Sequence, residues 1–290
     1  MKFTSLPPFG SHTYIMGIIN ITPDSFSGDG LMKSDQVILA ALQQANRFIQ
    51  YGAEILDIGG ESTRPGSTPV TTEQELDRVI PVIQEISAAH PEIILSIDTY
   101  KARVAQSALQ AGAHWINDIW ALRADDDMGS VAARFGAGLI LMHNRSQPSQ
   151  VEVQSKLGGR YIGVEYQNLI RDVQDELMQS VSLAHAAGVA DEKIILDPGI
   201  GFGKTVEQNL ELIDRLDEIC KLGYPVLLGP SRKGFIGYTL NLPPDQRMEG
   251  TAAAVAIGID RGADIVRVHD VPEIVQVARM TDAIVRCRRE

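Results

Sequence analysis

The chain has 290 residues, 44% of them hydrophobic, which is enough for a large core and excludes a disulfide-stapled miniprotein or a disordered tail. Its net charge of -11 makes a poor field for nucleic acid or for an anionic membrane surface. No apolar run reaches the roughly 18 residues of a membrane span, and the first residues lack the apolar stretch of a signal peptide, so we expect a cytoplasmic protein without membrane contact. Cys220 and Cys287 both lie in helical patterns and are expected to be reduced thiols.

Short aliphatic runs alternate along the chain with longer amphipathic stretches rich in Ala, Leu, Glu and Gln. The strands predicted from this pattern are 14–19, 55–58, 93–97, 115–116, 138–142, 194–196, 226–228 and 265–268. A helix is predicted after each strand. No low-complexity or linker segment divides the chain, so residues 1–290 are expected to form a single domain.

Eight strand and helix pairs in a chain of this length favour a (β/α)8 TIM barrel, an α/β fold that usually takes about 250 residues. The alternative is a doubly wound open sheet. That fold would have fewer strands and normally a glycine-rich turn after the first one, where this chain reads Ile18-Ile19-Asn20-Ile21-Thr22-Pro23. The absence of glycine there favours the barrel.

Polar residues follow every predicted strand. In chain order they are Asn20, Asp57, Asp98, Asn117 with Asp118, His143, Asp197, Ser231 to Lys233, and Arg267 with His269. Helix capping could explain Asp98, or Asn117 with Asp118, but capping does not require Lys233, Arg267 and His269. Because the loops after the strands of a barrel meet at one mouth, we expect these side chains to converge. Carboxylates together with cations suit a substrate with a polar heterocyclic end and an anionic end.

Three other readings of these residues are less favoured. The run Gly201–Thr205 resembles the end of a phosphate-binding P-loop, but Pro198 stands where that motif needs its first glycine. His143 has no second His or Cys at metal-ligand spacing, which favours a pocket wall over a zinc ligand. Lys233 could form a Schiff base with a carbonyl substrate, but the adjacent serine and arginine favour polar contacts.

The polar strand ends belong to longer motifs. In order, these are Asn20–Ser27, Gly60–Gly66, Ile97–Thr99, Ile116–Asp118, Met142–Asn144, Asp197–Lys204, Ser231–Lys233 and Arg267–Asp270. Together they resemble the ordered signature of the dihydropteroate synthase family, over essentially the whole chain. The resemblance implies an enzyme of folate biosynthesis that makes 7,8-dihydropteroate and diphosphate from (7,8-dihydropterin-6-yl)methyl diphosphate and 4-aminobenzoate. It also implies a Mg²⁺ cofactor and a homodimer.

The resemblance assigns roles to individual residues. The pterin substrate would be bound by Thr63, Asp98, Asn117, Met142, Asp197, Lys233, Arg267 and His269, of which Asp98, Asp197 and Lys233 would be catalytic. Arg267, His269 and Thr63 would hold the diphosphate, and Asn20 would bind Mg²⁺ directly. The 4-aminobenzoate pocket would consist of Phe26, Arg64, Pro65, Phe202 and Ser231.

One motif departs from the family pattern. The first loop usually continues Ser-Asp-Gly-Gly, whereas this chain reads Ser27-Gly28-Asp29-Gly30, which leaves open the loop atom that acts at the reacting centre. The glycines there favour a loop that closes over substrate.

Two other functions fit a pterin site. A methyltransferase domain of the methyltetrahydrofolate type has a similar barrel, but methyl transfer needs no diphosphate anchor, and Arg267 with His269 indicates one. A non-catalytic pterin carrier would need neither this anchor nor Asn20.

Overall fold

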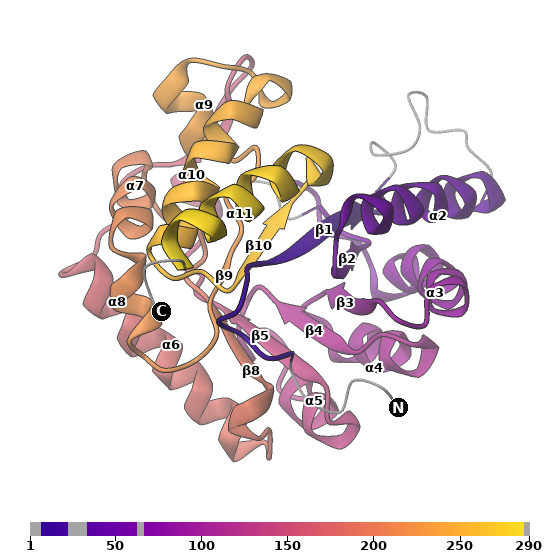
Figure 1. The fold of residues 1–290 in the computed structure, drawn as a ribbon. Coiled ribbons are helices and arrows are strands. Elements are labelled where there is room, and N and C mark those ends of the chain that lie inside the picture. Colours follow the sequence, from indigo (N-terminus) through magenta and orange to yellow (C-terminus); the bar gives the residue numbers. More distant parts are fainter. Residues whose placement is uncertain (1–6, 23–33, 63–66, 287–290) are drawn as a thin grey trace.

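The computed structural model describes residues 7–22, 34–62 and 67–286. Its main sheet has eight parallel strands in the order β8-β5-β4-β3-β2-β1-β10-β9 (Figure 1). Their bounds are β1 Tyr14–Asn20, β2 Ile55–Gly59, β3 Ile94–Asp98, β4 Trp115–Asp118, β5 Gly138–Met142, β8 Ile194–Asp197, β9 Leu227–Leu228 and β10 Ile265–Val268. A parallel bridge between Leu196 and Val226 joins β8 to the start of β9 and closes the ring. The predicted barrel is confirmed, and the open-sheet alternative is wrong.

Helices surround the strands on the outside of the barrel (Figure 1). The described ranges contain ten: α2 Ser34–Tyr51, α3 Thr72–Ala89, α4 Ala102–Ala111, α5 Met128–Phe135, α6 Leu169–Ala186, α7 Val206–Asp214, α8 Leu216–Cys220, α9 Gly234–Leu240, α10 Met248–Asp260 and α11 Val271–Arg286. Two helices follow β8 and two follow β9, where the sequence predicts one after each. Short 3-10 turns lie at Pro148–Gln150, Asp191–Lys193 and Pro244–Gln246. Among the described helices, none is long and apolar enough to cross a membrane.

A two-stranded antiparallel hairpin, β6 (Val151–Gln154) with β7 (Gly158–Tyr161), is inserted between β5 and α6. The sequence analysis does not predict it, because its strands are short and mostly polar and therefore give no alternating apolar signal. The hairpin is held against α9 and the following turn, since Tyr238 donates to Gly158 O at 3.1 Å and Arg247 donates to Leu157 O at 2.8 Å.

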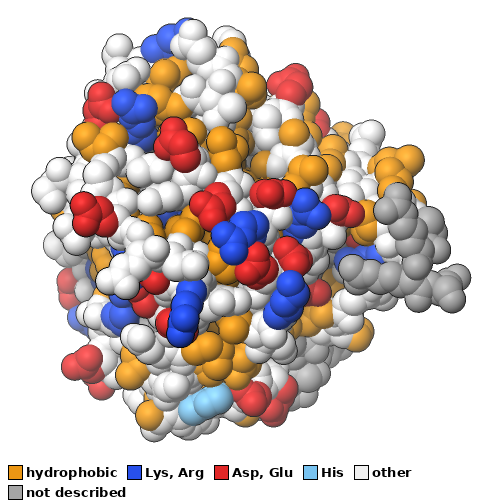
Figure 2. Space-filling model, turned by 90° about the vertical axis from the view of Figure 1, so that its left-hand side faces the viewer, with side chains coloured by type: hydrophobic (Ala, Val, Ile, Leu, Met, Phe, Trp, Pro, Cys, Tyr) orange, Lys and Arg blue, Asp and Glu red, His pale blue; other side chains and the backbone are white. Residues whose placement is uncertain are grey.

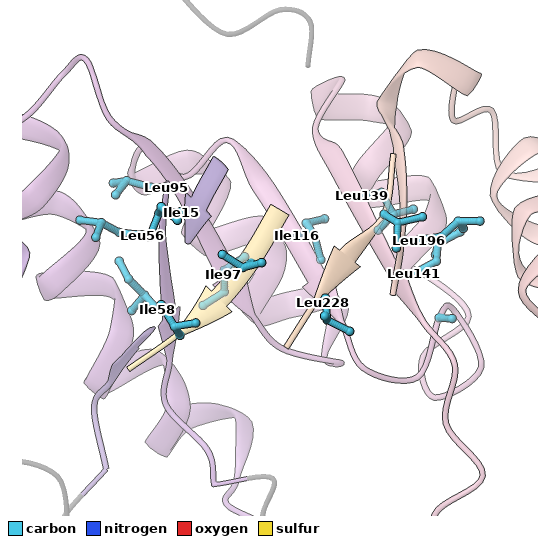
Figure 3. Packing of buried hydrophobic residues seen from close by; sticks show 14 of the residues in the cluster. Ile15, Leu56, Ile58, Leu95, Ile97, Ile116, Leu139, Leu141, Leu196 and Leu228 are labelled. Atoms are coloured by element: carbon cyan, nitrogen blue, oxygen red, sulfur yellow. The ribbon is translucent and has the colours of Figure 1, made fainter. Parts of the chain in front are cut away.

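Side chains of the barrel strands alternate between two apolar clusters. One cluster lies inside the barrel and takes residues from all eight strands: Tyr14, Met16, Ile55, Ile94, Trp115, Ile140, Ile195, Leu227 and Ile265. The other lies between the strands and the helices and includes the residues labelled in Figure 3: Ile15, Leu56, Ile58, Leu95, Ile97, Ile116, Leu139, Leu141, Leu196 and Leu228. Because successive residues of a strand face opposite sides, positions two beyond the inner cluster also face inward.

The inner cluster is covered at the amino-terminal ends of the strands by Phe9, whose ring meets the Tyr14 ring edge-on at 5.4 Å between centroids. At the other end the next inward positions are largely polar. They include Asp57, Ser96, Asn117, Asp197 and Arg267. The strand alternation therefore places the polar side chains at the carboxyl ends of the strands, above an apolar base.

Candidate active site

A buried ion-pair network connects four strands at the mouth of the barrel. Asp57 on β2 is 0% exposed, and its Oδ2 accepts from Arg267 Nε at 2.6 Å and from Asn117 Nδ2 at 3.0 Å. A second nitrogen of Arg267, on β10, donates to Asp98 Oδ2 on β3 at 2.6 Å. The network therefore unites two expected pterin-binding residues, Asp98 and Asn117, with the expected anion-binding arginine.

Asp57 is a site residue to which the sequence analysis gives no role. An ionised carboxylate only accepts hydrogen bonds, so Asp57 fixes the nitrogen of the Asn117 amide toward itself. The Asn117 oxygen is buried and has no hydrogen-bond partner among the described residues. Asn117 thus offers an acceptor to a ligand. Asp57 is among the strand-end residues expected at the mouth, and its position two residues beyond inward-facing Ile55 is the signal that could have given it a role in the site.

Both expected catalytic carboxylates have raised pKa values; Asp197 is buried and the Asp98 side chain is 11% exposed. Burial raises the pKa of Asp98 to about 7, although the Arg267 guanidinium opposes this shift. Burial also raises the pKa of Asp197, while Lys233 and the backbone N–H of Gly199, which donates to Asp197 Oδ1 at 2.7 Å, favour the charged form. The site therefore holds carboxylates whose charge is sensitive to nearby cations and hydrogen-bond donors.

Asn20, the expected metal ligand, lies beside Asp98. A Cβ atom placed on Gly59 would lie 3.6 Å from Asn20 Oδ1 and 3.5 Å from Asp98 Cβ. Glycine at this position leaves space between β1 and β3, which the Asn20 oxygen and the Asp98 side chain border. Thr63, expected to complete the anion site, lies outside the described residues.

Lys233 begins α9 and reaches back to the loop after β8. Its Nζ donates to Ile200 O and lies 4.7 Å from the centroid of the Phe202 ring. Burial lowers the pKa of Lys233 to about 8, and Asp197 opposes this shift. A Cβ on Gly229 would lie 3.8 Å from Lys233 Nζ and 3.8 Å from Arg267 Cβ, so the two cationic residues border the same glycine.

Ser231 and His269 meet at the ends of β9 and β10. Ser231 Oγ lies 3.0 Å from His269 Nδ1 and accepts from the His269 backbone N–H at 3.2 Å. Arg232 between Ser231 and Lys233 is directed elsewhere, since its Nε donates to Asp270 Oδ2 at 2.9 Å. The chain thus pairs a residue expected to bind 4-aminobenzoate with one expected to bind diphosphate.

The remaining expected residues divide into two groups. Met142 is buried at the end of β5, next to Asp197 in the strand register, and Phe202 lies beneath Lys233. The expected arylamine-pocket residues Phe26, Arg64 and Pro65 lie outside the described residues, as do residues 27–30 of the first loop.

Helix capping, the simpler explanation for some strand-end residues, is not the role of Asp118, because the next helix, α5, begins only at Met128. This carboxylate accepts the backbone N–H groups of Trp120 at 2.9 Å and Leu122 at 2.7 Å, and therefore fixes the turn after β4. Thr99 accepts from the backbone of Lys101 in the same manner at 3.2 Å. Asp98 and Asn117 instead have the contacts of the ion-pair network.

His143 does not line the mouth as the sequence analysis expects. It is buried beneath the loop after β8, where its Nδ1 contacts Lys204 Nζ at 2.9 Å and its Nε2 lies 3.0 Å from Glu176 Oε2. Burial lowers the pKa of His143 to about 3, with Lys204 adding to the shift, so the ring is neutral. Within the described ranges, no group of three His, Cys, Asp or Glu side chains could hold a metal ion.

The base of the second loop has an ionic cluster that the sequence analysis misses. Lys101 Nζ contacts both Glu61 and Glu75, the latter at 2.5 Å, and Tyr100 donates its hydroxyl hydrogen to Glu61 at 2.8 Å. These residues belong to β2's loop, α3 and the start of α4, which are distant in sequence. The cluster therefore fixes the point at which the second loop leaves the barrel.

Comparisons with known proteins give a consistent result. Residues 16–269 match the family model of pterin-binding enzymes. The chain is 50% identical to dihydropteroate synthase from Clostridium beijerinckii, over 96% of each chain. A dihydropteroate synthase structure from Clostridium difficile, determined with pteroic acid, has a TM-score of 0.87 and 46% identity over 97% of this chain and 100% of that one. The enzyme from Xanthomonas albilineans, with 4-aminobenzoic acid, has a TM-score of 0.84 and 38% identity over 94% and 93%.

Proposed function

The chain belongs to the dihydropteroate synthase family, and we propose that it condenses (7,8-dihydropterin-6-yl)methyl diphosphate with 4-aminobenzoate, releasing 7,8-dihydropteroate and diphosphate. It is thus a transferase of folate biosynthesis. The observation that carries the proposal is the buried network of Asp57, Asp98, Asn117 and Arg267 at the barrel mouth, next to Lys233. Since all eight barrel strands lie between Tyr14 and Val268, we also propose a single domain.

The acceptors of the network suit the edge of a dihydropterin. An aminopyrimidinone ring presents several N–H donors, and a buried edge of this kind must be fully paired for tight binding. Asp98, Asp197 and the Asn117 oxygen would accept from these donors, and Lys233 would donate to a ring oxygen or nitrogen. Met142 would pack on the ring from β5.

Arg267 and His269 would bind the diphosphate. Arg267 uses its Nε for Asp57 and one terminal nitrogen for Asp98, and its other terminal nitrogen would donate to the diphosphate. This arrangement would widen the role that the sequence suggests, because Arg267 would bind the anion as well as pair with Asp57 and the pterin-reading Asp98. His269 lies two residues further along, where strand alternation gives the same orientation.

In the proposed reaction, positive charge develops on the pterin and negative charge on the leaving diphosphate. Diphosphate leaves the exocyclic methylene carbon, and the resulting cation is delocalised into the electron-rich pterin ring before the weakly basic arylamine attacks. Asp98 and Asp197 would stabilise the cation, while Arg267 and His269 would stabilise the departing anion. The reaction therefore needs no covalent nucleophile on the protein.

We propose Mg²⁺ as the cofactor, with Asn20 as its direct protein ligand. The amide oxygen of Asn20 is a hard donor beside Asp98, and the described residues offer no carboxylate cage. This donor set fits an ion that keeps several waters and takes its other ligands from substrate phosphate. Mg²⁺ would supply positive charge at the leaving diphosphate.

The arylamine pocket is proposed between the loops. Phe202 would form one wall and Ser231 would receive the 4-aminobenzoate carboxylate, with Phe26, Arg64 and Pro65 completing the walls. Ser231 contacts His269, so the second substrate and the diphosphate would occupy adjacent sites.

We also propose a homodimer that works in the cytoplasm. Leu240 at the end of α9 and Ile257 on the alanine-rich helix α10 are each 47% exposed. Figure 2 shows this side of the molecule, where hydrophobic side chains lie among acidic and basic ones. Mixed surfaces of this kind are typical of protein interfaces.

Sedimentation equilibrium tests the dimer. The Ile257→Glu variant should be a monomer, and a monomeric wild-type protein would contradict the proposal.

Release of diphosphate tests the function. With both substrates and Mg²⁺, the enzyme should release diphosphate and form dihydropteroate in equal amounts, and release should depend on 4-aminobenzoate. Asp197→Asn is the matched control, because it keeps the shape of the side chain and removes its charge. A pterin carrier would release no diphosphate, and a methyltransferase would not consume the diphosphate ester.

A further inference from the structure

Lys204, the last residue of the Asp197–Lys204 motif, is a buried cation that the proposed chemistry does not use. It is 1% exposed. Its Nζ contacts three acceptors: His143 Nδ1 at 2.9 Å, Gly199 O at 3.0 Å and Phe202 O at 3.1 Å. Burial lowers the pKa of Lys204 to about 7, and Asp197 opposes this shift. An ammonium group has three N–H donors and a neutral amine has two, so the three acceptors favour the ammonium form.

Two of these acceptors belong to the loop 198–203, which carries groups of the proposed site at both ends. Gly199 donates its N–H to Asp197, Ile200 accepts from Lys233, and the Phe202 ring lies under the Lys233 ammonium. The loop therefore determines the positions of a pterin-reading carboxylate, a pterin-reading cation and an arylamine wall.

The backbone of the loop 198–203 needs hydrogen bonds from residues outside the loop to keep its conformation. Gly199, Gly201 and Gly203 have φ values of +71°, +83° and +58°, a conformation that only glycine adopts without strain. A segment so rich in glycine has few side chains with which to fix itself. Lys204 supplies two hydrogen bonds from beneath, to Gly199 O and Phe202 O.

His143, the third partner of Lys204, is itself held by a contact with helix α6. Because Nδ1 of neutral His143 accepts from Lys204, the ring hydrogen lies on Nε2, which faces Glu176 of α6 at 3.0 Å. Glu176 is in turn paired with Arg145. After Lys204 the chain enters α7 through a capping box, in which Thr205 and Gln208 each accept the other's backbone N–H, at 3.3 and 2.9 Å.

We propose that Lys204 is a positioning residue for both substrates: its ammonium group holds the loop 198–203 in the shape that aligns Asp197, Lys233 and Phe202. The inference rests on the proposed function, because it takes these three residues to contact substrate. The glycine and lysine pattern that resembles a P-loop in sequence thus stabilises the loop after β8. The lysine is directed into the protein and away from any phosphate.

Lys204→Met tests this role, since it keeps the length of the side chain and removes its N–H donors. Lys221→Met is the control, because Lys221 is an exposed lysine directly after α8 whose described side-chain contact is Asp217 of that helix. For Lys204→Met we expect the KM for 4-aminobenzoate to rise and the affinity for the pterin to fall, each by about ten- to a hundredfold. Affinity for Mg²⁺-diphosphate should stay within about twofold, because no described hydrogen bond joins Asn20, Arg267 or His269 to the loop.

The KM values separate positioning from stability. A residue that only stabilises the fold would lower the unfolding temperature and leave the KM values of the folded enzyme unchanged. Unchanged KM values in folded Lys204→Met would therefore overturn the proposal. If Lys204→Met does not fold, Lys204→Gln, which keeps two N–H donors, is measured instead, and if neither variant folds the positioning role is overturned.

The proposed function and the positioning role of Lys204 are tested by different measurements. Wild-type enzyme that releases no diphosphate would contradict the function. Pterin calorimetry on Lys204→Met needs no turnover and still decides whether the loop depends on this lysine.

Discussion

Arg267 shows how single residues set the charge of the site. Its guanidinium is shared between Asp57 and Asp98, so two buried carboxylates share one cation. Buried charges are tolerated only when paired, and breaking such a pair costs several kcal/mol, about 3 to 5. The remaining negative charge is available for the N–H donors of a pterin or for a developing cation. A ligand therefore completes the electrostatic balance of the network.

The pKa of Asp98 leads to a prediction about pH. Because burial raises this pKa to about 7, Asp98 in the free enzyme is ionised above that pH and protonated below it. If the ionised form accepts pterin N–H groups, kcat/KM for the pterin substrate should fall by about tenfold per pH unit below the pKa. In Asp98→Asn this acid limb should be absent and the rate low throughout. An identical limb in the variant would assign it to another group.

Asp57 and Asn117 should act as a unit in pterin binding. Asp57→Ala releases the amide of Asn117, so we expect it to weaken the pterin complex although Asp57 lies beneath the proposed contacts. The double-mutant cycle with Asn117→Ala should give a coupling energy of about 1 kcal/mol or more. Calorimetry of the single and double variants measures it. Additive losses would show that Asp57 acts only through Arg267.

At the scale of elements, the strands could be predicted and the loops could not. All eight strands, and the inward orientation of Asp98, Asn117 and Asp197, follow from apolar runs and from the alternation of side chains. The hairpin β6–β7 gives no periodic signal. The contacts of Lys204 with His143, and of Lys101 with Glu61, join residues far apart in sequence, and only the folded chain brings them together.

The glycine loop after β8 provides a prediction at this scale. A Cβ on Gly199 would lie 1.8 Å from His143 O, whereas one on Gly223 would have nothing within 4 Å, although both glycines have positive φ. Gly223→Ala should thus cost about 1 kcal/mol of unfolding free energy from backbone strain alone. Gly199→Ala should cost clearly more and also weaken pterin binding. Equal losses in denaturant titrations would show that the close contact relaxes without cost.

At the scale of the whole molecule, the barrel separates stability from chemistry. Residues from all eight strands form the apolar inner cluster, covered by Phe9 at one end, and the polar network lies above it. The ring closes through one bridge between β8 and β9. The loops that follow these two strands carry Phe202, Ser231 and Lys233, so three residues of the proposed site lie next to this seam.

We propose that the mouth is divided into a pterin-reading part and an anion-binding part. His269→Ala tests it most directly, because His269 contacts neither Asp98 nor Asn117 through any described hydrogen bond, whereas Arg267 touches both parts. Calorimetry would compare the diphosphate ester with the bare hydroxymethyl-dihydropterin, each in the presence of Mg²⁺. We predict that His269→Ala binds the bare pterin within about twofold of wild type and loses about tenfold or more in affinity for the ester. Equal weakening of both ligands would contradict the division of the site.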